Sequence, residues 1–250
     1  MLGNMHIALK DVDSTNSHAR ALLRDGAGEG TVVTAEHQTA GRGRLDRQWS
    51  DETGLSFLGS YILEPVRPPE DWGGIPLMSG VAVLRALSSL VPIDLHLKWP
   101  NDVLSADKKI SGILVESGQM GIRRWVVIGI GINLNQRSFT GDYRMPPTSL
   151  LLETGRMVST EEVLAVLSKE LDSLYRQWTE EGNPVILEEW KRHSRMFGQE
   201  MEMELEKGAQ QRVTVVDIAP SGALVVRNPK GEQIEVFAGD IAFTRDDQGA

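Results

Sequence analysis

The spacing of the apolar positions changes along the chain, and it predicts helices in some segments and strands in others. In the middle of the chain, apolar residues recur at the spacing of one face of a helix, and Pro92 ends this helix. They are Leu77, Met78, Val81, Leu84, Leu87 and Leu90. One further helix is expected from Ser14 to Gly26, and another from the capping box of residues 159–162. A last helix takes Asn183 as its cap and Pro184 as its first helical residue.

Runs of β-branched and apolar residues predict strands over the first half of the chain. They lie at residues 31–35, 54–63, 95–99, 110–116 and 125–134, with a hairpin turn at Asp107-Lys108. After Arg195 the sequence alternates strictly at 200–206 and then forms short strands at 213–218, 223–227 and 233–237. The pattern therefore predicts an α+β domain over residues 1–196 and a small β-barrel over residues 197–250.

Composition narrows the classes of function. The chain has 250 residues, of which 26 are basic and 35 acidic, and its net charge of −9 argues against unspecific binding to DNA or anionic membranes. It has no cysteine, which excludes disulfides, thiolate metal sites and cysteine nucleophiles, and its five histidines show no metal-ligand spacing. Neither a signal peptide nor an apolar run near the ~20 residues of a membrane helix is visible, so we expect a cytoplasmic protein.

Residues 38–49, which we call the arginine loop, have the most unusual composition of the chain. Gly41 and Gly43 lack Cβ atoms, so backbone N–H groups can close on a ligand there. Arginines between and after them offer planar cations that suit phosphate or carboxylate, and Trp49 can cover such a ligand. The same composition also fits an exposed loop with solvated arginines, because short Gly/Arg motifs arise by chance.

Two later segments place polar groups at the ends of strands. Residues 98–102 lead from a strand into a turn that presents Asn101 and Asp102, although both residue types are common in turns for local reasons. Lys109 begins the next segment and either reaches over a pocket or is simply solvated. Gly112, three residues later in a buried strand, indicates the close approach of a backbone or a ligand.

The apolar strand at residues 126–135 contains Gly129 and Gly131 and ends in two asparagines, Asn133 and Asn135. Because the glycines lie inside the strand and no helix follows, a dinucleotide-binding turn does not fit. A flat ligand that lies against the sheet explains these glycines better. The sequence contains neither a Walker-type phosphate loop nor a serine in a Gly-flanked nucleophile elbow.

Taken in order, these segments resemble the biotin protein ligase (holocarboxylase synthetase) family. The resemblance rests on residues 13–16, 38–49, 98–102, 109–116, 129–133 and 148–155, and it extends to the C-terminal barrel with residues 239–241. It implies a mixed central sheet flanked by helices, of the class II synthetase-like ligase type, with an SH3-like barrel. It also implies a two-step reaction, in which biotin and MgATP give biotinyl-5'-adenylate, and a lysine of a biotin carboxyl carrier protein then displaces AMP.

The resemblance also implies roles for individual residues. The expected biotin-binding residues are Ser14, Thr15, Asn16, Gln38, Gly41, Arg42, Gly43, Arg44, Lys109, Gly112 and Gly131. The expected adenylate-binding residues are Arg42, Arg44, Arg47, Trp49, Asn101, Lys109 and Asn133. The expected catalytic residues are Lys109, Arg44 and Asp102, with Mg²⁺ brought by ATP and its protein ligands unknown.

The chain departs from the repressor-type members of that family in two places. Leu45-Asp46 stands where those members carry further Gly and Arg, which bears on how tightly the loop retains the adenylate. The Ser-Thr-Asn motif begins at Ser14, so no DNA-binding domain fits before it and we expect neither a repressor role nor nucleic-acid binding. An edge strand of the sheet would allow a homodimer. Residues 136–147 are expected to cover the adenine, with Phe139 and Tyr143 as candidates to stack on it.

Two other functions compete with this interpretation. A lipoate or octanoate ligase has a similar fold and chemistry, but it carries a triple-glycine motif where Gly41-Arg42-Gly43-Arg44 stands here. A non-catalytic interaction module would need a basic face with interleaved aromatics on the barrel. The barrel instead begins with Glu200, Glu202, Glu204 and Glu206.

Overall fold

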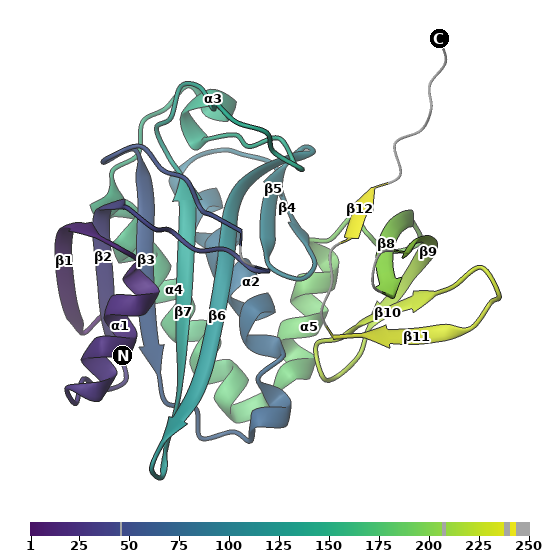
Figure 1. The fold of residues 1–250 in the computed structure, drawn as a ribbon, viewed down its shortest axis with the longest axis horizontal. Coiled ribbons are helices and arrows are strands. Elements are labelled where there is room, and N and C mark those ends of the chain that lie inside the picture. The colour runs from purple at the N-terminus through teal and green to yellow at the C-terminus, as the bar shows by residue number, and fades with distance from the viewer. Residues whose placement is uncertain (46, 207–208, 238–240, 244–250) are drawn as a thin grey trace.

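The larger part of the fold is a seven-stranded sheet with the order β1-β2-β3-β7-β6-β5-β4 (Figure 1). The computed structural model describes residues 1–45, 47–206, 209–237 and 241–243. The strands are β1 (Met5–Val12), β2 (Thr31–Gln38), β3 (Ser56–Leu63), β4 (Leu95–Lys98), β5 (Asp102–Ser105), β6 (Lys108–Met120) and β7 (Arg123–Asn133). β1 and β2 pair in parallel and the other neighbours pair antiparallel, so the predicted mixed sheet is confirmed.

The sequence pattern missed β1 and β5. Most residues of β1 are exposed or half-buried, because β1 is an edge strand, and the apolar signal of such a strand is weak. β5 has only four residues, and it joins β6 through a turn at residues 106–107, where Ala106 has a φ of 47°. The predicted turn at Asp107-Lys108 was therefore one residue late. Pairing of a second copy at an edge strand stays a prediction.

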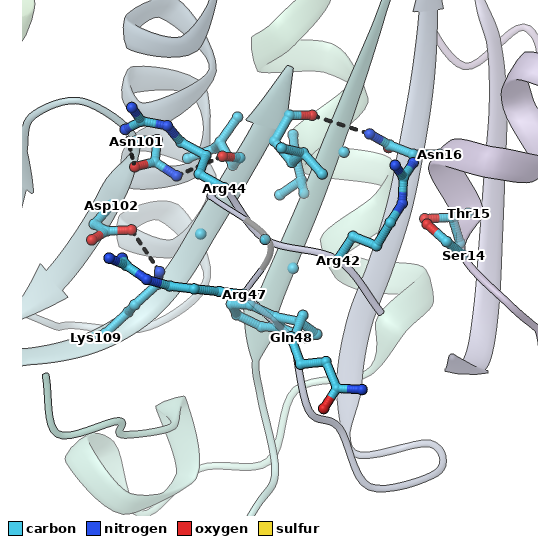
Figure 2. A pocket seen from close by; sticks show the side chains of 18 of the residues that line it. Ser14, Thr15, Asn16, Arg42, Arg44, Arg47, Gln48, Asn101, Asp102 and Lys109 are labelled. Carbon is cyan, nitrogen blue, oxygen red and sulfur yellow. Dashed lines mark hydrogen bonds and ion pairs between the residues drawn. The ribbon is translucent and has the colours of Figure 1, made fainter. Parts of the chain in front are cut away.

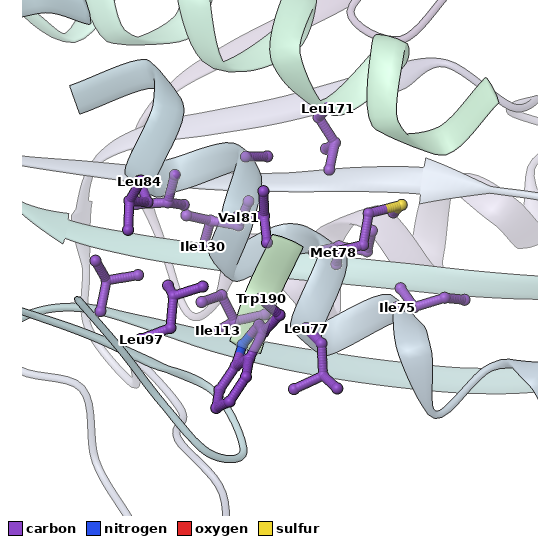
Figure 3. Close-up of a cluster of buried hydrophobic side chains, with 14 of the residues drawn as sticks. Ile75, Leu77, Met78, Val81, Leu84, Leu97, Ile113, Ile130, Leu171 and Trp190 are labelled. Carbon is purple, nitrogen blue, oxygen red and sulfur yellow. The ribbon is translucent and has the colours of Figure 1, made fainter. Parts of the chain in front are cut away.

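Helices cover both faces of this sheet (Figure 1). They are α1 (Thr15–Arg24), the 3₁₀ helix η1 (Pro69–Asp71), α2 (Gly74–Leu90), α3 (Leu150–Thr154), α4 (Thr160–Glu181) and α5 (Asn183–Arg192). Val32 and Val33 follow each other in β2 and therefore point to opposite faces. Val32 belongs to the main core, together with residues of α2, α4 and α5. Figure 3 shows the side chains of this core around α2. Val33 instead packs with Ala19 and Leu23 of α1, so α1 lies on the other face.

Two predicted helix starts can be compared with the structure. The capping box of α4 is confirmed, with Ser159 and Glu162 each bonding the backbone N–H of the other. The predicted cap of α5 was wrong, because Gly182 is the N-cap and Asn183 is already helical. The Asn183 side chain instead accepts a hydrogen bond from Trp178 Nε1 at 2.7 Å and donates one to the Pro220 carbonyl at 2.8 Å.

The C-terminal part is a five-stranded antiparallel sheet with the order β11-β10-β9-β8-β12. Its strands are β8 (Glu200–Glu206), β9 (Ala209–Ile218), β10 (Leu224–Arg227), β11 (Gln233–Val236) and β12 (Ile241–Phe243). Within the described residues β11 and β12 are its two edges, so hydrogen bonds do not close it into a barrel there. Asp46, Gly239-Asp240 and the side chains of Glu204 and Glu206 lie outside what the structure describes.

The turn at residues 219–223 joins this small sheet to the larger part of the fold. Trp99 Nε1 donates to the Gly222 carbonyl at 3.1 Å, and Asn183 reaches Pro220 as described above. Gly73 lies so close to the Ser221 backbone that a Cβ atom there would clash. The small sheet therefore supports the segment after β4. The division of the chain at residue 196 stays a prediction. In the part of the chain that is described, no helix is long and apolar enough to cross a membrane.

Candidate active site

Three glycines form the floor of the site on the face of the sheet that carries α1. Gly112 of β6 and Gly131 of β7 are direct partners in the sheet, and Gly129 is two residues away in β7. A Cβ atom on Gly131 would lie 2.6 Å from Trp49 Cε2, and one on Gly112 would lie 3.1 Å from Trp49 Cζ3. A Cβ atom on Gly129 would clash with the Asn16 amide. The group against these glycines is the protein's own indole or amide. All three glycines also line the first cavity, and a flat ligand at the sheet stays a prediction.

The N-terminal end of α1 forms one end of the site. The Thr15 backbone N–H and hydroxyl both donate to Gln38 Oε1, at 2.8 and 3.1 Å, and the Ser60 hydroxyl lies 2.7 Å from the Thr15 hydroxyl. Ser14 is the N-cap by position, although its side chain makes no capping bond. Ser14, Thr15, Asn16 and Ser60 are almost completely buried, and Gln38 is half-buried. Together these residues present hydroxyl and amide groups at a recessed end of the site, which suits a small polar ring system.

The arginine loop closes on itself and rests on the floor through Trp49, although Arg42, Arg47 and Gln48 are exposed. Its two limbs are joined by backbone bonds, from Trp49 N–H to the Gly41 carbonyl at 3.0 Å and from Gly43 N–H to the Arg47 carbonyl at 2.7 Å. Gly41 is buried, and a Cβ atom there would clash with the Trp49 carbonyl. Leu45, at the tip, has a φ of 54° and is exposed. The glycines therefore allow the loop to close on itself, and Trp49 anchors it to the sheet.

Arg42 and Arg44 extend in different directions from the loop (Figure 2) and reach different partners. Arg42 makes a two-point contact with the Glu116 carboxylate at 3.1 and 2.8 Å. Arg44 donates to Asn101 Oδ1 at 3.3 Å, and Asn101 in turn donates to the Ile113 carbonyl at 2.7 Å. Burial lowers the pKa of the Arg44 guanidinium, and nearby Asp102 opposes that shift. Arg44 stays a cation, because its pKa starts far above neutral pH.

Lys109 is held over the site and is not a solvated strand end. Its ammonium group lies 2.6 Å from Asp102 Oδ1 and 5.8 Å from the centre of the Trp49 ring, and its side chain is 28% exposed. The ion pair and the cation–π contact fix the position of this charge. The pairing follows from strand order, because Asp102 lies in β5 and Lys109 in the adjacent β6.

Two cavities adjoin at this lysine. The first, of about 830 Å³, extends from the α1 end over the glycine floor, and the second, of about 920 Å³, extends under residues 139–147. The residues that line both cavities are Arg47, Gln48, Trp49, Lys98, Asp102 and Lys109. The structure therefore describes two compartments with a common, strongly charged boundary.

Lys98 is the most unusual group at this boundary. It is only 6% exposed, and within the described residues its ammonium group makes no hydrogen bond or ion pair. Burial lowers its pKa to about 8, Asp102 opposes this effect, and Lys109 adds to it. A buried ammonium group without a close partner is costly, which favours an anionic ligand at this position.

Most of the predicted site residues come together in these cavities. The first cavity is lined by Ser14, Thr15, Asn16, Gln38, Arg42, Gly43, Arg44, Arg47, Trp49, Asn101, Asp102, Lys109, Gly112 and Gly131. Asn133 lines the second cavity, where its amide donates to the Thr148 carbonyl at 2.9 Å. Gly41 lines neither and acts inside the loop. Phe139 and Tyr143 both line the second cavity.

Sequence reasoning assigned no role to several residues of the site. Lys98 stood in a segment that we singled out, but its burial could not be read from a strand of only four residues. Gln48 lies in the arginine loop and lines both cavities, and Gly129 was noted only as part of a glycine-bearing strand. Glu116 ends the segment 109–116, and nothing else in the sequence indicated a role for it. For these four residues, the only indication in the sequence of a place in the site was that they lie within the segments already singled out.

Comparison with known proteins gives a consistent assignment. Residues 9–133 match the biotin/lipoate A/B protein ligase family, and residues 196–244 match the biotin protein ligase C terminal domain. The chain is 34% identical over 238 residues to the biotin–acetyl-CoA-carboxylase ligase of Mycobacterium tuberculosis, which covers 93% of this chain and 86% of that protein. It is 32% identical over 241 residues to the protein of the same description from Paracoccus denitrificans, with coverage of 92% and 99%.

A solved structure agrees with these relatives. The biotin protein ligase from Aquifex aeolicus in complex with biotin and ATP has a TM-score of 0.81 and 28% sequence identity to this chain, and the match covers 97% of this chain and 100% of that one. The chain therefore belongs to the biotin/lipoate A/B protein ligase family and, within it, to the biotin protein ligases.

Proposed function

We propose that this chain activates biotin with ATP and transfers it to a lysine of a carboxylase carrier protein. In the first step a biotin carboxylate oxygen bonds to the α-phosphorus of ATP, and the bond to the β-phosphate oxygen breaks. The products are biotinyl-5'-adenylate and pyrophosphate. In the second step the ε-amine of the carrier lysine attacks the acyl carbon, AMP leaves, and the amine loses a proton.

The observation that carries this proposal is the shared boundary of the two cavities. An acid in the first cavity and a nucleotide in the second would meet where Lys98, Asp102 and Lys109 line both spaces. The reaction needs this arrangement, because the attacking carboxylate and the α-phosphate must be brought into contact although both are anions. Two separate pockets would not achieve it.

The cations at the boundary can offset this repulsion. We assign Lys109 to the carboxylate and the α-phosphate, because it is fixed between Asp102 and the Trp49 ring. Lys98, buried and without a close partner, is suited to the phosphate charge that builds up as pyrophosphate leaves. Arg44 approaches from the loop and adds a permanent charge. These groups are held by the fold before the substrates bind, so little reorganisation is needed during the reaction.

Asp102 is the carboxylate at the boundary, and we assign it two roles. It positions Lys109 in the first step. In the second step it accepts the proton that the attacking carrier lysine loses, as a general base does.

A magnesium ion that arrives with ATP fits the site. Among the described residues there is no cluster of three or more acidic or histidine side chains, so the protein has no closed cage for a metal there. Magnesium bound to nucleotide typically needs only one or two carboxylates in addition to phosphate oxygens and water. Asp102 can supply that carboxylate. The ion would neutralise phosphate charge.

The end of the first cavity is assigned to the ring system of biotin. Buried Ser14 and Thr15 and half-buried Gln38 offer hydroxyl, amide and backbone groups, which suit the carbonyl and N–H groups of a ureido ring. The first cavity is also lined by Trp49, Ile130 and Lys109, which gives the aliphatic tail an apolar lining on the way to the lysine. The nucleotide base is assigned to the second cavity, with Phe139 and Tyr143 as its aromatic lining.

The test is isotope exchange between pyrophosphate and ATP with a panel of acids. We expect exchange that depends on biotin, and much weaker exchange with lipoate or octanoate, because neither has a ureido ring to satisfy the buried polar end. Equal or faster exchange with lipoate or octanoate would contradict the assignment of biotin. An absence of exchange with every acid would contradict the adenylation chemistry itself.

A further inference from the structure

Glu116 is an internal residue of β6 whose carboxylate is contacted by Arg42, Asn16 and Arg20. It lies on β6 opposite Val127 of β7, and its side chain is 19% exposed. Besides the two bonds from Arg42, it accepts one from Asn16 Nδ2 at 2.8 Å, and Arg20 Nη1 lies 3.3 Å from its Oε1 atom. A single carboxylate thus connects the arginine loop, α1 and the central sheet.

The contact with Arg42 ties down the first half of the arginine loop. The second half is tied elsewhere, through the bond from Arg44 to Asn101 and through the Trp49 ring on the glycine floor. Opening the loop requires that the Arg42–Glu116 pair separates. Its two-point geometry makes it stronger than an ordinary surface ion pair.

The contact with Asn16 reaches into the first cavity. Asn16 donates through Nδ2 to Glu116 and, at 3.3 Å, to the Leu114 carbonyl, so its Oδ1 atom faces the Ser60 hydroxyl, which donates to it at 2.6 Å. Loss of Glu116 would remove the stronger of the two acceptors that fix this amide. Glu116 therefore couples the closure of the loop to the shape of the cavity wall.

We propose that Glu116 is a positioning residue that latches the arginine loop shut through Arg42 and so retains the acyl-adenylate. This inference rests on the proposed function, because the retained molecule is the product of its first step. Retention protects a mixed anhydride from water until the carrier lysine arrives. Glu116 does not touch the reacting atoms. Its loss should therefore speed release of the intermediate far more than it slows adenylation.

The first experiment measures how fast preformed biotinyl-adenylate leaves the intact protein. Glu116→Gln keeps the size of the side chain and removes its charge, and Arg42→Gln removes the other half of the pair. We expect Glu116→Gln to release the intermediate about 10-fold faster, which corresponds to about 1.4 kcal/mol. We also expect the double variant to release it no faster than the faster single variant, because both changes open the same latch. Glu188→Gln, in an exposed helical pair with Arg192, is the matched control and should release at the original rate.

Release at the original rate by Glu116→Gln would overturn the proposal, as would strictly additive effects of the two substitutions. A second measurement needs no ligand: trypsin cleavage after the arginines of the loop should be about 10-fold faster in Glu116→Gln than in Glu188→Gln. If the wild-type chain forms no adenylate but Glu116→Gln exposes the loop, the proposed function fails and the latch stands. Equal cleavage of both variants contradicts the latch whatever the chemistry is.

Discussion

Gly131 offers a direct way to disturb the active site without touching any polar group. Substitution to alanine would place a Cβ atom 2.6 Å from Trp49 Cε2 and 2.7 Å from Cζ2. Carbon atoms in contact lie about 3.5–4.0 Å apart, so the indole ring must retreat by about 1 Å. The ring cannot simply rotate away, because it also lies against Gly112 and under the Lys109 ammonium group.

The displacement should cost both stability and activity. Overpacking of this kind typically destabilises by about 1–3 kcal/mol. A displacement of about 1 Å at a group that positions reactants can cost about 100-fold in rate. Because Trp49 carries the arginine loop and lines both cavities, we expect adenylation to fall by about 10- to 100-fold in kcat/KM.

The assay is biotin-dependent pyrophosphate exchange, with thermal unfolding measured in parallel. Gly28→Ala is the matched control, because a Cβ atom at Gly28 meets nothing within 4 Å and its backbone conformation is open to alanine. We expect the control to exchange like the original chain and to unfold at the same temperature or slightly above it. If Gly131→Ala exchanged and unfolded like Gly28→Ala, Trp49 would not be packed on this floor, and our account of the site would be wrong.

Three further predictions concern single side chains. Lys109→Ala should abolish adenylation and leave the unfolding transition nearly unchanged, and near-normal exchange would show that its ion pair with Asp102 has no part in the reaction. The pKa of Lys98 is lowered to about 8, so Lys98 loses its positive charge as the pH rises through that value, and kcat/KM for ATP should fall above it. Lys98→Arg keeps the charge, so kcat/KM for ATP should stay high to a higher pH. The same decrease in kcat/KM at alkaline pH in both proteins would exclude Lys98 as its cause. Asn183→Ala leaves Trp178 Nε1 without its buried acceptor and removes the bond to Pro220, so urea unfolding should show a loss of about 1–3 kcal/mol, whereas an unchanged midpoint would mean that other groups replace both bonds.

The sequence predicted those parts of the fold that depend on local pattern. Most strands of the large sheet, helix α2 and the capping box at Ser159 follow from the spacing of apolar residues and from capping chemistry. β1 was missed because an edge strand buries little. Asn183 was misread because Asn before Pro is a common helix start, and only its contacts with Trp178 and Pro220 in the folded chain show where its amide points.

The same limit applies to the site. Gly112, Gly129 and Gly131 were correctly taken as places of close approach, but what approaches them depends on how the loop and α1 fold over the sheet. Lys109 could equally have been solvated, and its pairing with Asp102 depends on the order of β5 and β6. Glu116 finds its partners 74 and 100 residues earlier, in Arg42 and Asn16, and no local pattern contains that information.

The central claim is that the protein forms biotinyl-5'-adenylate where its two cavities adjoin. The most direct measurement is mass spectrometry of the small molecules that the protein retains after incubation with MgATP and equal amounts of biotin, lipoate and octanoate. We expect biotinyl-5'-adenylate in about a one-to-one ratio with the protein, with neither of the other two adenylates at a comparable level. Retention of lipoyl- or octanoyl-adenylate instead, or of nucleotide with no acyl group attached, would contradict the account.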